Sequence, residues 1–330
     1  MKIAVDVMGS DKGPVELTKG AVAAAEKGGF QIVLFGDEKI IKDTLSTLKY
    51  AADVEVVNAS ETITMCDKAT SVIKEKKTSS MAMALSAVAE GKCDAVVSSG
   101  NSGALITGAT FIVKRAKGVK RPAFAPVIPS ATGPVIIVDS GANVECRPEF
   151  LAQFGKMGAV YMEKVMGFEN PSVGLLSNGS EDSKGTDVTR EAKALLEKSD
   201  CNFIGYIEGN DIMTGKSCVV VCDGFTGNVA LKTIEGMGKF VSARVKNLLT
   251  GNPIRTIGTL FMIRGIKKFK KEFDSKQYGG AMILGVRAPV VKAHGSADGA
   301  AFGIAVAQAA RVAENNVCGT IASAFETEQE

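Results

Sequence analysis

The strongest constraint on the fold of this chain is an alternation of short, β-branched apolar runs with longer, alanine-rich stretches. The runs are almost continuously apolar, and the stretches between them have helical character. Continuous apolar strands separated by helices are typical of a parallel sheet covered on both faces, because both faces of each strand are buried. The sequence therefore predicts an α/β fold with a mostly parallel sheet. The runs expected to form strands lie at residues 2–7, 31–36, 54–59, 94–99, 134–140, 172–177, 218–223 and 288–293.

The size and charge of the chain narrow its class. A chain of 330 residues with 45% hydrophobic content can bury a large core, in one long α/β domain or two smaller ones. No repeat, low-complexity tract or proline-rich linker marks a boundary, so we expect residues 1–330 to form a single catalytic domain. The 39 basic and 36 acidic side chains nearly cancel, which argues against a nucleic-acid-binding protein with its usual basic excess.

Cysteine and histidine usage indicates the compartment and excludes the common metal sites. The seven cysteines are an odd number without a C-x-x-C motif, which is typical of reduced thiols in the cytoplasm. Cys218 and Cys222 would stand roughly 13 Å apart on a strand, too far to share a zinc ion. We expect no metal and no cofactor. The first apolar run is interrupted at Asp6, unlike a signal peptide, and no run of ~18 apolar residues spans a bilayer.

Six of the expected strands end in loops rich in Gly, Ser, Asn and Asp. In a parallel sheet such loops gather at the carboxyl edge, where ligands bind and where helix N-termini present free N–H groups to an oxyanion. One such loop would be ordinary capping. Six at one edge predict a small anionic ligand, with phosphate the obvious candidate. The loops are "VDVMGSDKGP", "VVSSGNSGALITG", "IIVDSGANVECRPEF", "LLSNGSEDSKGTD", "VVVCDGFTGNVALKT" and "VVKAHGSADGAA".

Two nucleotide-binding motifs are absent or misplaced. The segment "GNDIMTGKS" at 209–217 resembles a Walker motif, but it has five residues between its glycines and precedes a strand. A P-loop needs a strand, then the loop, then a helix. The chain also lacks the G-x-G-x-x-G fingerprint of dinucleotide-binding folds. The expected anion is therefore not a nucleotide held in either standard way.

Seven segments resemble, in order and over nearly the whole chain, the bacterial acyl-carrier-protein:phosphate acyltransferases of phospholipid synthesis. They are "IAVDVMGSDKGP", "SSGNSGAL", "RPAFAPVIP", "VDSGAN", "GSEDSKG", "DGFTGNVALK" and "YGGAMILGVRAPVVKAHGSAD". The resemblance implies that inorganic phosphate attacks the thioester of a long-chain acyl-acyl-carrier protein, giving acyl phosphate and free carrier. It also implies a homodimer with a Rossmann-like α/β/α sandwich and a helical protrusion, related to isopropylmalate dehydrogenases and phosphotransacetylases.

This chemistry needs cations and N–H donors more than strong acid–base groups, because phosphate is already nucleophilic and a thiolate leaves readily. The only histidine, His294, and Lys184 are the candidate catalytic residues. His294 could instead merely pack and hydrogen-bond. We interpret Lys232 and Lys292, which also lie beside glycine-rich loops, as solvated side chains.

Neutral donors and strand-terminal carboxylates complete the expected site. The candidate phosphate- or substrate-binding residues are Gly9, Gly100, Asn101, Ser102, Gly103, Asn143, Asp223, Gly224, Asn228 and Ser296. Asp6, Asp139 and Asp223 end their strands at the same edge. They either orient the cations or cap the turns that follow.

Residues 247–274 have the pattern of a basic amphipathic helix, within an amphipathic segment expected at about 240–275. Residues 254–263 are apolar nearly all round, so they need burial in the core, in a partner subunit or in lipid. An acidic carrier protein could dock on the same basic groups. The candidate contact residues are Ile257, Leu260, Phe261, Arg264, Lys267 and Lys268.

Two other functions remain open on the sequence. A phosphotransacetylase-like enzyme acting on acyl-coenzyme A would share the fold and the phosphate edge. A non-catalytic, phosphate-dependent regulator at the membrane would bind carrier and lipid without consuming thioester. For the acyltransferase we expect a cytoplasmic, peripherally membrane-associated protein.

Overall fold

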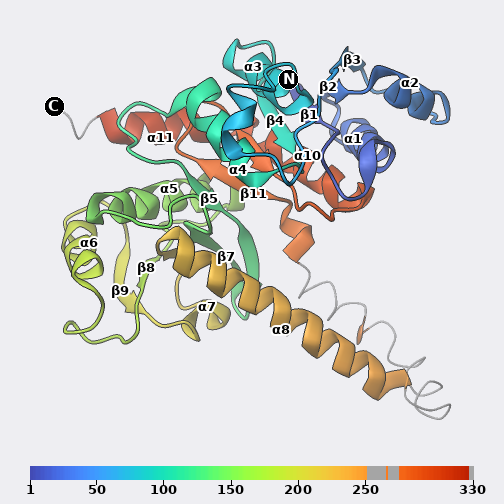
Figure 1. Ribbon diagram of the computed structural model, residues 1–330. Helices are drawn as coiled ribbons and strands as arrows, with labels where there is room; N and C mark the ends of the chain where they lie inside the picture. The colour runs from blue at the N-terminus through green and yellow to red at the C-terminus, as the bar shows by residue number, and fades with distance from the viewer. Residues whose placement is uncertain (251–264, 267–274, 327–330) are drawn as a thin grey trace.

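The computed structural model describes residues 1–250, 265–266 and 275–326, and it confirms the α/β fold with mostly parallel sheets between helices (Figure 1). The strands divide between two sheets. The larger sheet has the order β3 (Val54–Asn58), β2 (Gln31–Gly36), β1 (Lys2–Asp6), β4 (Ala95–Ser98), β12 (Val290–Lys292), β11 (Ala281–Leu284) and β5 (Ala123–Ala125). The smaller sheet has the order β6 (Val127–Ser130), β7 (Gly133–Val138), β10 (Val219–Val221), β8 (Val173–Leu176) and β9 (Phe203–Ile207).

Helices cover both faces of each sheet. The helices are α1 (Gly13–Gly28), α2 (Glu38–Ser46), α3 (Ser80–Ala89), α4 (Ser102–Gly108), α5 (Pro148–Met166), α6 (Asp187–Glu197), α7 (Asp211–Thr214), α8 (Gly224–Thr250), α10 (Gly299–Glu314) and α11 (Val317–Glu326), with shorter turns η1 (Ala69–Val72), η2 (Ala109–Lys114) and η3 (Ser275–Tyr278). On the larger sheet α1 and α10 pack on one face, and α3 and α4 on the other. On the smaller sheet α5 and α6 pack on one face, and α7 and the start of α8 on the other.

The alternation of side chains along β1 shows how the sequence builds these layers. Ile3 and Val5 are buried against α1 and α10, while Ala4 between them is buried against α3. Successive side chains of a strand point to opposite faces, so a strand covered on both sides must be apolar at every position. All eight runs expected to be strands form strands.

The four strands without a sequence prediction are β5, β6, β9 and β11. Strands β5 and β6 form one segment that passes from the larger sheet to the smaller one through Pro126. Each is the edge strand of its sheet, which is where proline is tolerated because it donates no ladder hydrogen bond. Because proline is uncommon in strands, the sequence of this segment did not predict these two strands.

One hydrophobic cluster joins the two sheets. Ala125 and Met282 of the larger sheet share it with Val138 and Val219 of the smaller sheet. This shared core supports the single-domain interpretation of residues 1–330, which stays a prediction.

Helix α8 begins on the smaller sheet and extends away from the body of the molecule (Figure 1). Ala230, Leu231 and Ile234 pack against the sheet, whereas Phe240 and Leu248 farther along are 56% and 61% exposed. No helix in the described ranges is long and apolar enough to cross a bilayer. The expected contact residues Ile257, Leu260, Phe261, Arg264, Lys267 and Lys268 lie outside the described residues.

Candidate active site

The polar loops gather at two sheet edges, and this corrects the expectation of a single edge. Three of them follow the neighbouring strands β1, β4 and β12 of the larger sheet. The other three follow the neighbouring strands β7, β10 and β8 of the smaller sheet. Each sheet therefore contributes one cluster of three adjacent loops.

At the edge of the larger sheet, Asp6, Ser98 and Lys292 form a row in register across three parallel strands. The Ser98 hydroxyl donates to Asp6 Oδ2 at 2.6 Å, and the Met8 N–H donates to Asp6 Oδ1 at 3.0 Å. Burial raises the pKa of Asp6, while these hydrogen bonds oppose the rise. Asp6 therefore holds the chain at the end of β1. The ammonium of Lys292 lies close enough to lower the pKa of this carboxyl group.

Lys292 is not the solvated side chain expected from the sequence. It is partly buried at the end of β12, and its ammonium donates to the carbonyls of Ser99 at 3.2 Å and Ala293 at 2.6 Å. Desolvation lowers its pKa to about 8, against the attraction of Asp6 and Asp11. The sequence did contain a signal for this burial. Side chains two residues apart on a strand share a face, so Lys292 lies on the same face of the strand as the buried Val290.

His294 is exposed in the loop after β12 and its tautomer is fixed by the backbone. The Ser296 N–H donates to His294 Nδ1 at 3.2 Å, and Ser296 Oγ lies 2.9 Å from the same nitrogen. Because an N–H group can only donate, Nδ1 accepts and the ring proton lies on Nε2. Desolvation by the surrounding atoms lowers the pKa of His294, which favours the neutral imidazole that presents Nε2–H as a donor.

Helix α8 brings the edge of the smaller sheet to His294. Lys232 and Glu235 on this helix form an ion pair at 2.8 Å. Both act on the imidazole, since the Glu235 carboxylate raises the pKa of His294 and the Lys232 ammonium lowers it. The charges on α8 therefore reach the loop after β12.

Asp139 organises the corresponding edge of the smaller sheet. Its carboxylate accepts hydrogen bonds from the backbone N–H groups of Phe124, Ser140, Gly141, Ala142 and Asn143. Burial raises the pKa of Asp139, and these hydrogen bonds lower it. Of the two roles left open by the sequence, the structure gives Asp139 the role of holding its loop.

Helix α8 is anchored on this loop. The Gly224 N–H donates to the Asn143 carbonyl at 2.7 Å, and Asp223 Oδ1 accepts from the Thr226 N–H at 2.8 Å as the helix cap. Gly227 packs so tightly that a Cβ there would lie 1.9 Å from the Asp139 carbonyl oxygen. Asn228, one residue on, is exposed near Gly141.

Two of the expected phosphate ligands use their amides within the protein. Asn101 caps α4 by accepting from the Ala104 N–H at 3.1 Å, and its Nδ2 contacts the carbonyls of residues 64, 65 and 67. Asn143 Nδ2 donates to the Pro122 carbonyl at 2.8 Å and to Asp139 Oδ2 at 3.0 Å. These amides shape the loops that carry them, and their assignment as ligands stays a prediction.

Close backbone approach explains the glycines beside Asn101. A Cβ on Gly9, which has φ of +72°, would lie 3.3 Å from Gly100 Cα, and a Cβ on Gly100 would lie 2.7 Å from Met81 Cε. Next to them, Ser102 is exposed and Gly103 is half-buried at the start of α4. The hydroxyl of Ser102 is thus accessible to a ligand, as is that of Ser296 on the neighbouring loop.

Lys184 is placed in the loop after β8, at the edge of the smaller sheet. Its side chain packs beside Gly179, and its backbone N–H donates to the Glu181 carbonyl at 3.0 Å. Lys184 and His294 therefore stand at the edges of different sheets.

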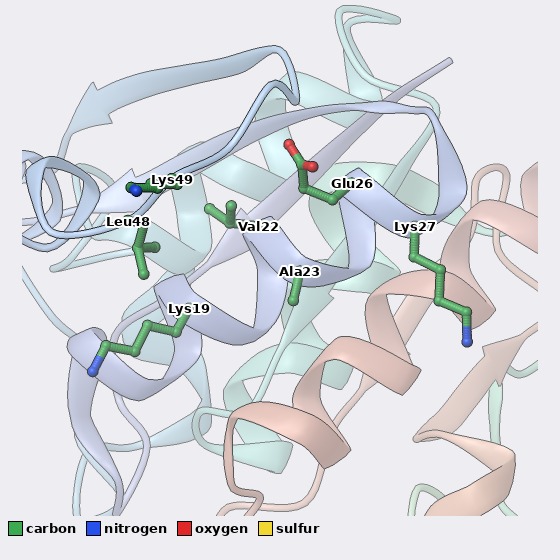
Figure 2. Close-up of a pocket in the computed structure, with 7 residues that line it drawn as sticks. All are labelled: Lys19, Val22, Ala23, Glu26, Lys27, Leu48 and Lys49. Atoms are coloured by element: carbon green, nitrogen blue, oxygen red, sulfur yellow. The ribbon is translucent and has the colours of Figure 1, made fainter.

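A separate hollow of about 450 Å³ lies on the outside of α1 (Figure 2). Its lining includes Lys19, Lys27 and Lys49, and no residue of the candidate site. The Glu26 carboxylate at its rim accepts the Ala52 N–H at 2.5 Å and so fixes the turn before β3. None of its lining residues belongs to the loops described above.

The arrangement suits an anion that reacts with a carbonyl. It combines cations, exposed hydroxyls, helix N-termini and a neutral imidazole that donates from Nε2. The described residues contain no group of three or more His, Cys, Asp or Glu side chains that could hold a metal ion. Sequence reasoning interpreted Lys292 as solvated and did not name Ser98 or Glu235, and of these three only Lys292 had a signal in the strand pattern.

Comparison with known proteins gives these loops a context. Residues 1–320 match a family described as "Fatty acid synthesis protein". A phosphate acyltransferase from Clostridium novyi (strain NT) is 43% identical over 328 residues, covering 99% of each chain. Another from Alkaliphilus oremlandii (strain OhILAs) is 43% identical over 318 residues, covering 96% of this chain and 95% of that protein.

Solved structures share the fold at low sequence identity. A phosphotransacetylase from Streptococcus pyogenes superposes with a TM-score of 0.65 at 16% identity, covering 95% of this chain and 94% of that chain. A 4-hydroxythreonine-4-phosphate dehydrogenase from Klebsiella pneumoniae gives a TM-score of 0.56 at 12% identity, covering 94% and 99%. The expected likeness to phosphotransacetylases and dehydrogenases is confirmed for the fold.

Proposed function

The chain belongs to the fatty acid synthesis protein family that includes the phosphate acyltransferases, and we propose that it moves a long-chain fatty acyl group from acyl-acyl-carrier protein to inorganic phosphate. The product would be an acyl phosphate for phosphatidic acid and phospholipid synthesis. The observation that carries this proposal is His294, a neutral donor set among cations and helix N-termini at a sheet edge.

The proposed reaction balances without a cofactor. An oxygen of monohydrogen phosphate attacks the thioester carbonyl carbon, forming a C–O bond and a tetrahedral oxyanion. The C–S bond then breaks, and the proton of the phosphate passes to the departing thiolate. Because a thiol has a pKa of about 8.5, the leaving group needs little acid assistance. The enzyme must chiefly align a dianion with a carbonyl that itself becomes negative.

His294 is suited to the developing oxyanion. With Nδ1 occupied by Ser296, the Nε2–H is free to donate to the carbonyl oxygen as its charge grows. We assign phosphate binding to the N–H groups and hydroxyls at the starts of α4 and α10, near Ser102 and Ser296. Lys184 is retained as a proposed catalytic cation on the side of the smaller sheet.

The partners proposed for this enzyme are a second subunit, the carrier protein and an anionic membrane surface. The exposed apolar side chains of α8, among them Phe240 and Leu248, support an interface beyond the core of one chain. We assign the membrane contact to residues 254–271, which are apolar and then strongly basic. We place the protein in the cytoplasm, held peripherally at the membrane.

The test of the proposed function is release of carrier thiol from palmitoyl-acyl-carrier protein, titrated with and without phosphate and without added metal. We expect release to require phosphate. Palmitoyl-coenzyme A in a parallel reaction separates the phosphotransacetylase-like alternative, which would use that donor at least as well. Release that ignores phosphate would indicate a thioesterase, and binding of carrier without release would indicate a regulator.

A further inference from the structure

We propose that Lys292 is a positioning residue of this site, which ties the ends of β4 and β12 together and holds His294 in the form that donates. Its ammonium bridges two backbone carbonyls, those of Ser99 and Ala293. The first precedes the Gly100 loop and the second precedes His294 itself. For catalysis the inference rests on the proposed function, but the contacts that carry it do not.

The position of the bridge explains why a lysine is needed there. The ladder between the two strands ends where the Ala293 N–H donates to the Ser98 carbonyl at 2.9 Å. Beyond that bond the chains separate into two loops, and the ammonium supplies donors to one carbonyl of each. A charged donor to a carbonyl makes a stronger hydrogen bond than a neutral one. Lys292 thus fixes the spacing of the two loops that flank the expected phosphate.

The charge of Lys292 acts on the imidazole as well. The groups that face His294 are Lys292 from β12 and Lys232, Glu235 and Lys239 from α8. The three ammonium groups lower the pKa of His294 and only the carboxylate raises it. Lys292 therefore helps to keep the imidazole neutral, with Nδ1 accepting from Ser296.

The charge of Lys292 is itself balanced from the larger sheet. Asp6 on β1 and Asp11 in the following loop attract its ammonium, while Lys232 on α8 repels it. With desolvation, these charges place the pKa of Lys292 at about 8. Lys292 is thus mainly charged at pH 7, and titrates well below an ordinary lysine.

The single histidine makes the inference directly measurable. The full-length protein, labelled on histidine with nitrogen-15, gives signals from one imidazole only, and its titration needs no substrate. In wild type we expect the midpoint below 6.5, with nitrogen shifts that place the proton on Nε2. We also expect a second, smaller inflection of the His294 signals near pH 8, when Lys292 loses its proton.

Two substitutions separate charge from packing. Lys292→Met should raise the His294 midpoint by several tenths of a pH unit, remove the inflection near pH 8 and lower kcat at least tenfold. Lys292→Arg keeps the charge, so it should keep the low midpoint, lose the inflection and retain more activity than Lys292→Met. Lys27→Met, on the outer surface of α1, is the matched control and should change neither signal nor rate.

The outcomes decide the inference independently of the proposed reaction. A folded Lys292→Met protein with an unchanged midpoint and unchanged tautomer would overturn it, whatever the protein does to thioesters. If Lys292→Met fails to fold, wild type and Lys292→Arg still decide. An inflection near pH 8 that persists in Lys292→Arg would show that another group causes it and would overturn the inference.

Discussion

At the scale of single residues, one backbone N–H determines how His294 can act. Ser296 donates to Nδ1, so the proton of the neutral ring must point outward from Nε2. Had the loop offered a carbonyl instead, the same imidazole would present an acceptor and suit a general base. The loop "AHGS" thus selects a hydrogen-bond donor, which fits a reaction that generates negative charge on oxygen.

We expect His294→Ala to lower turnover by roughly ten- to a thousandfold, the range of single acid–base or oxyanion contributions. The fold should survive, because the side chain is exposed. Phosphate-dependent thiol release, with circular dichroism as the folding check, measures both. Lys27→Met, on the outer surface of α1, is the control and should leave turnover unchanged. Unchanged turnover in a folded His294→Ala protein would leave the histidine with a packing role only.

At the scale of elements, the site depends on how closely α8 sits on the loop of Asp139. Gly227 faces the Asp139 carbonyl, and a Cβ would need space at 1.9 Å, closer than any real contact. The helix could accept a side chain there only by shifting away from the loop. Such a shift would also displace Asn228 and Lys232 on the same helix.

We therefore expect Gly227→Ala to lower the free energy of unfolding by ~2 kcal/mol or more and to reduce activity strongly. Gly236→Ala on the same helix is the matched control, because nothing lies within 4 Å of its Cβ. That change should be neutral or stabilise by up to ~1 kcal/mol through helix propensity. Chemical denaturation and thiol release measure the two variants. Equal stability of the Gly227→Ala and Gly236→Ala proteins would show that α8 does not require the close contact between Gly227 and the Asp139 carbonyl.

At the scale of the whole molecule, the extended part of α8 precedes in the chain residues 254–271, of which the structure describes only residues 265–266. Exposed side chains on α8, such as Phe240, continue the apolar character of that segment. A basic amphipathic segment near an anionic surface gains ~1 kcal/mol for each cation, and more from inserted apolar side chains. The membrane is the partner we propose for this end of the molecule.

We expect the wild-type protein to sediment with anionic liposomes at low salt and less with neutral ones. Leu260→Glu should weaken sedimentation at all salt concentrations, because it removes the apolar contribution. Lys267→Glu with Lys268→Glu should weaken it mainly at low salt, where charges are least screened. Leu195→Glu, at an exposed leucine on α6, is the control for a general loss of apolar surface. If the wild-type protein stays in the supernatant with anionic liposomes, dimer packing would be the better explanation for the apolar character of residues 254–271.

The sequence by itself determined the elements and the chemistry of their loops. The strand pattern of residues such as Ile3, Ala4 and Val5 is local, since burial on both faces requires an apolar side chain at every position. The glycine, serine and asparagine residues after the strands are local signals too, because they meet the needs of turns and caps. These patterns were enough to predict the eight strands.

The tertiary structure decided which of these elements meet. Strand pairing joins residues far apart in the chain, so no local pattern could divide the strands between two sheets. The same pairing put Lys292 beside Ser98 and Asp6, and so turned an apparently solvated lysine into a partly buried bridge between two loops. Tertiary contacts also engage the Asn101 amide in hydrogen bonds within the protein. The division of the strands places Lys184 and His294 at the edges of different sheets. A side chain's role depends on the groups around it, and those groups come from distant parts of the chain.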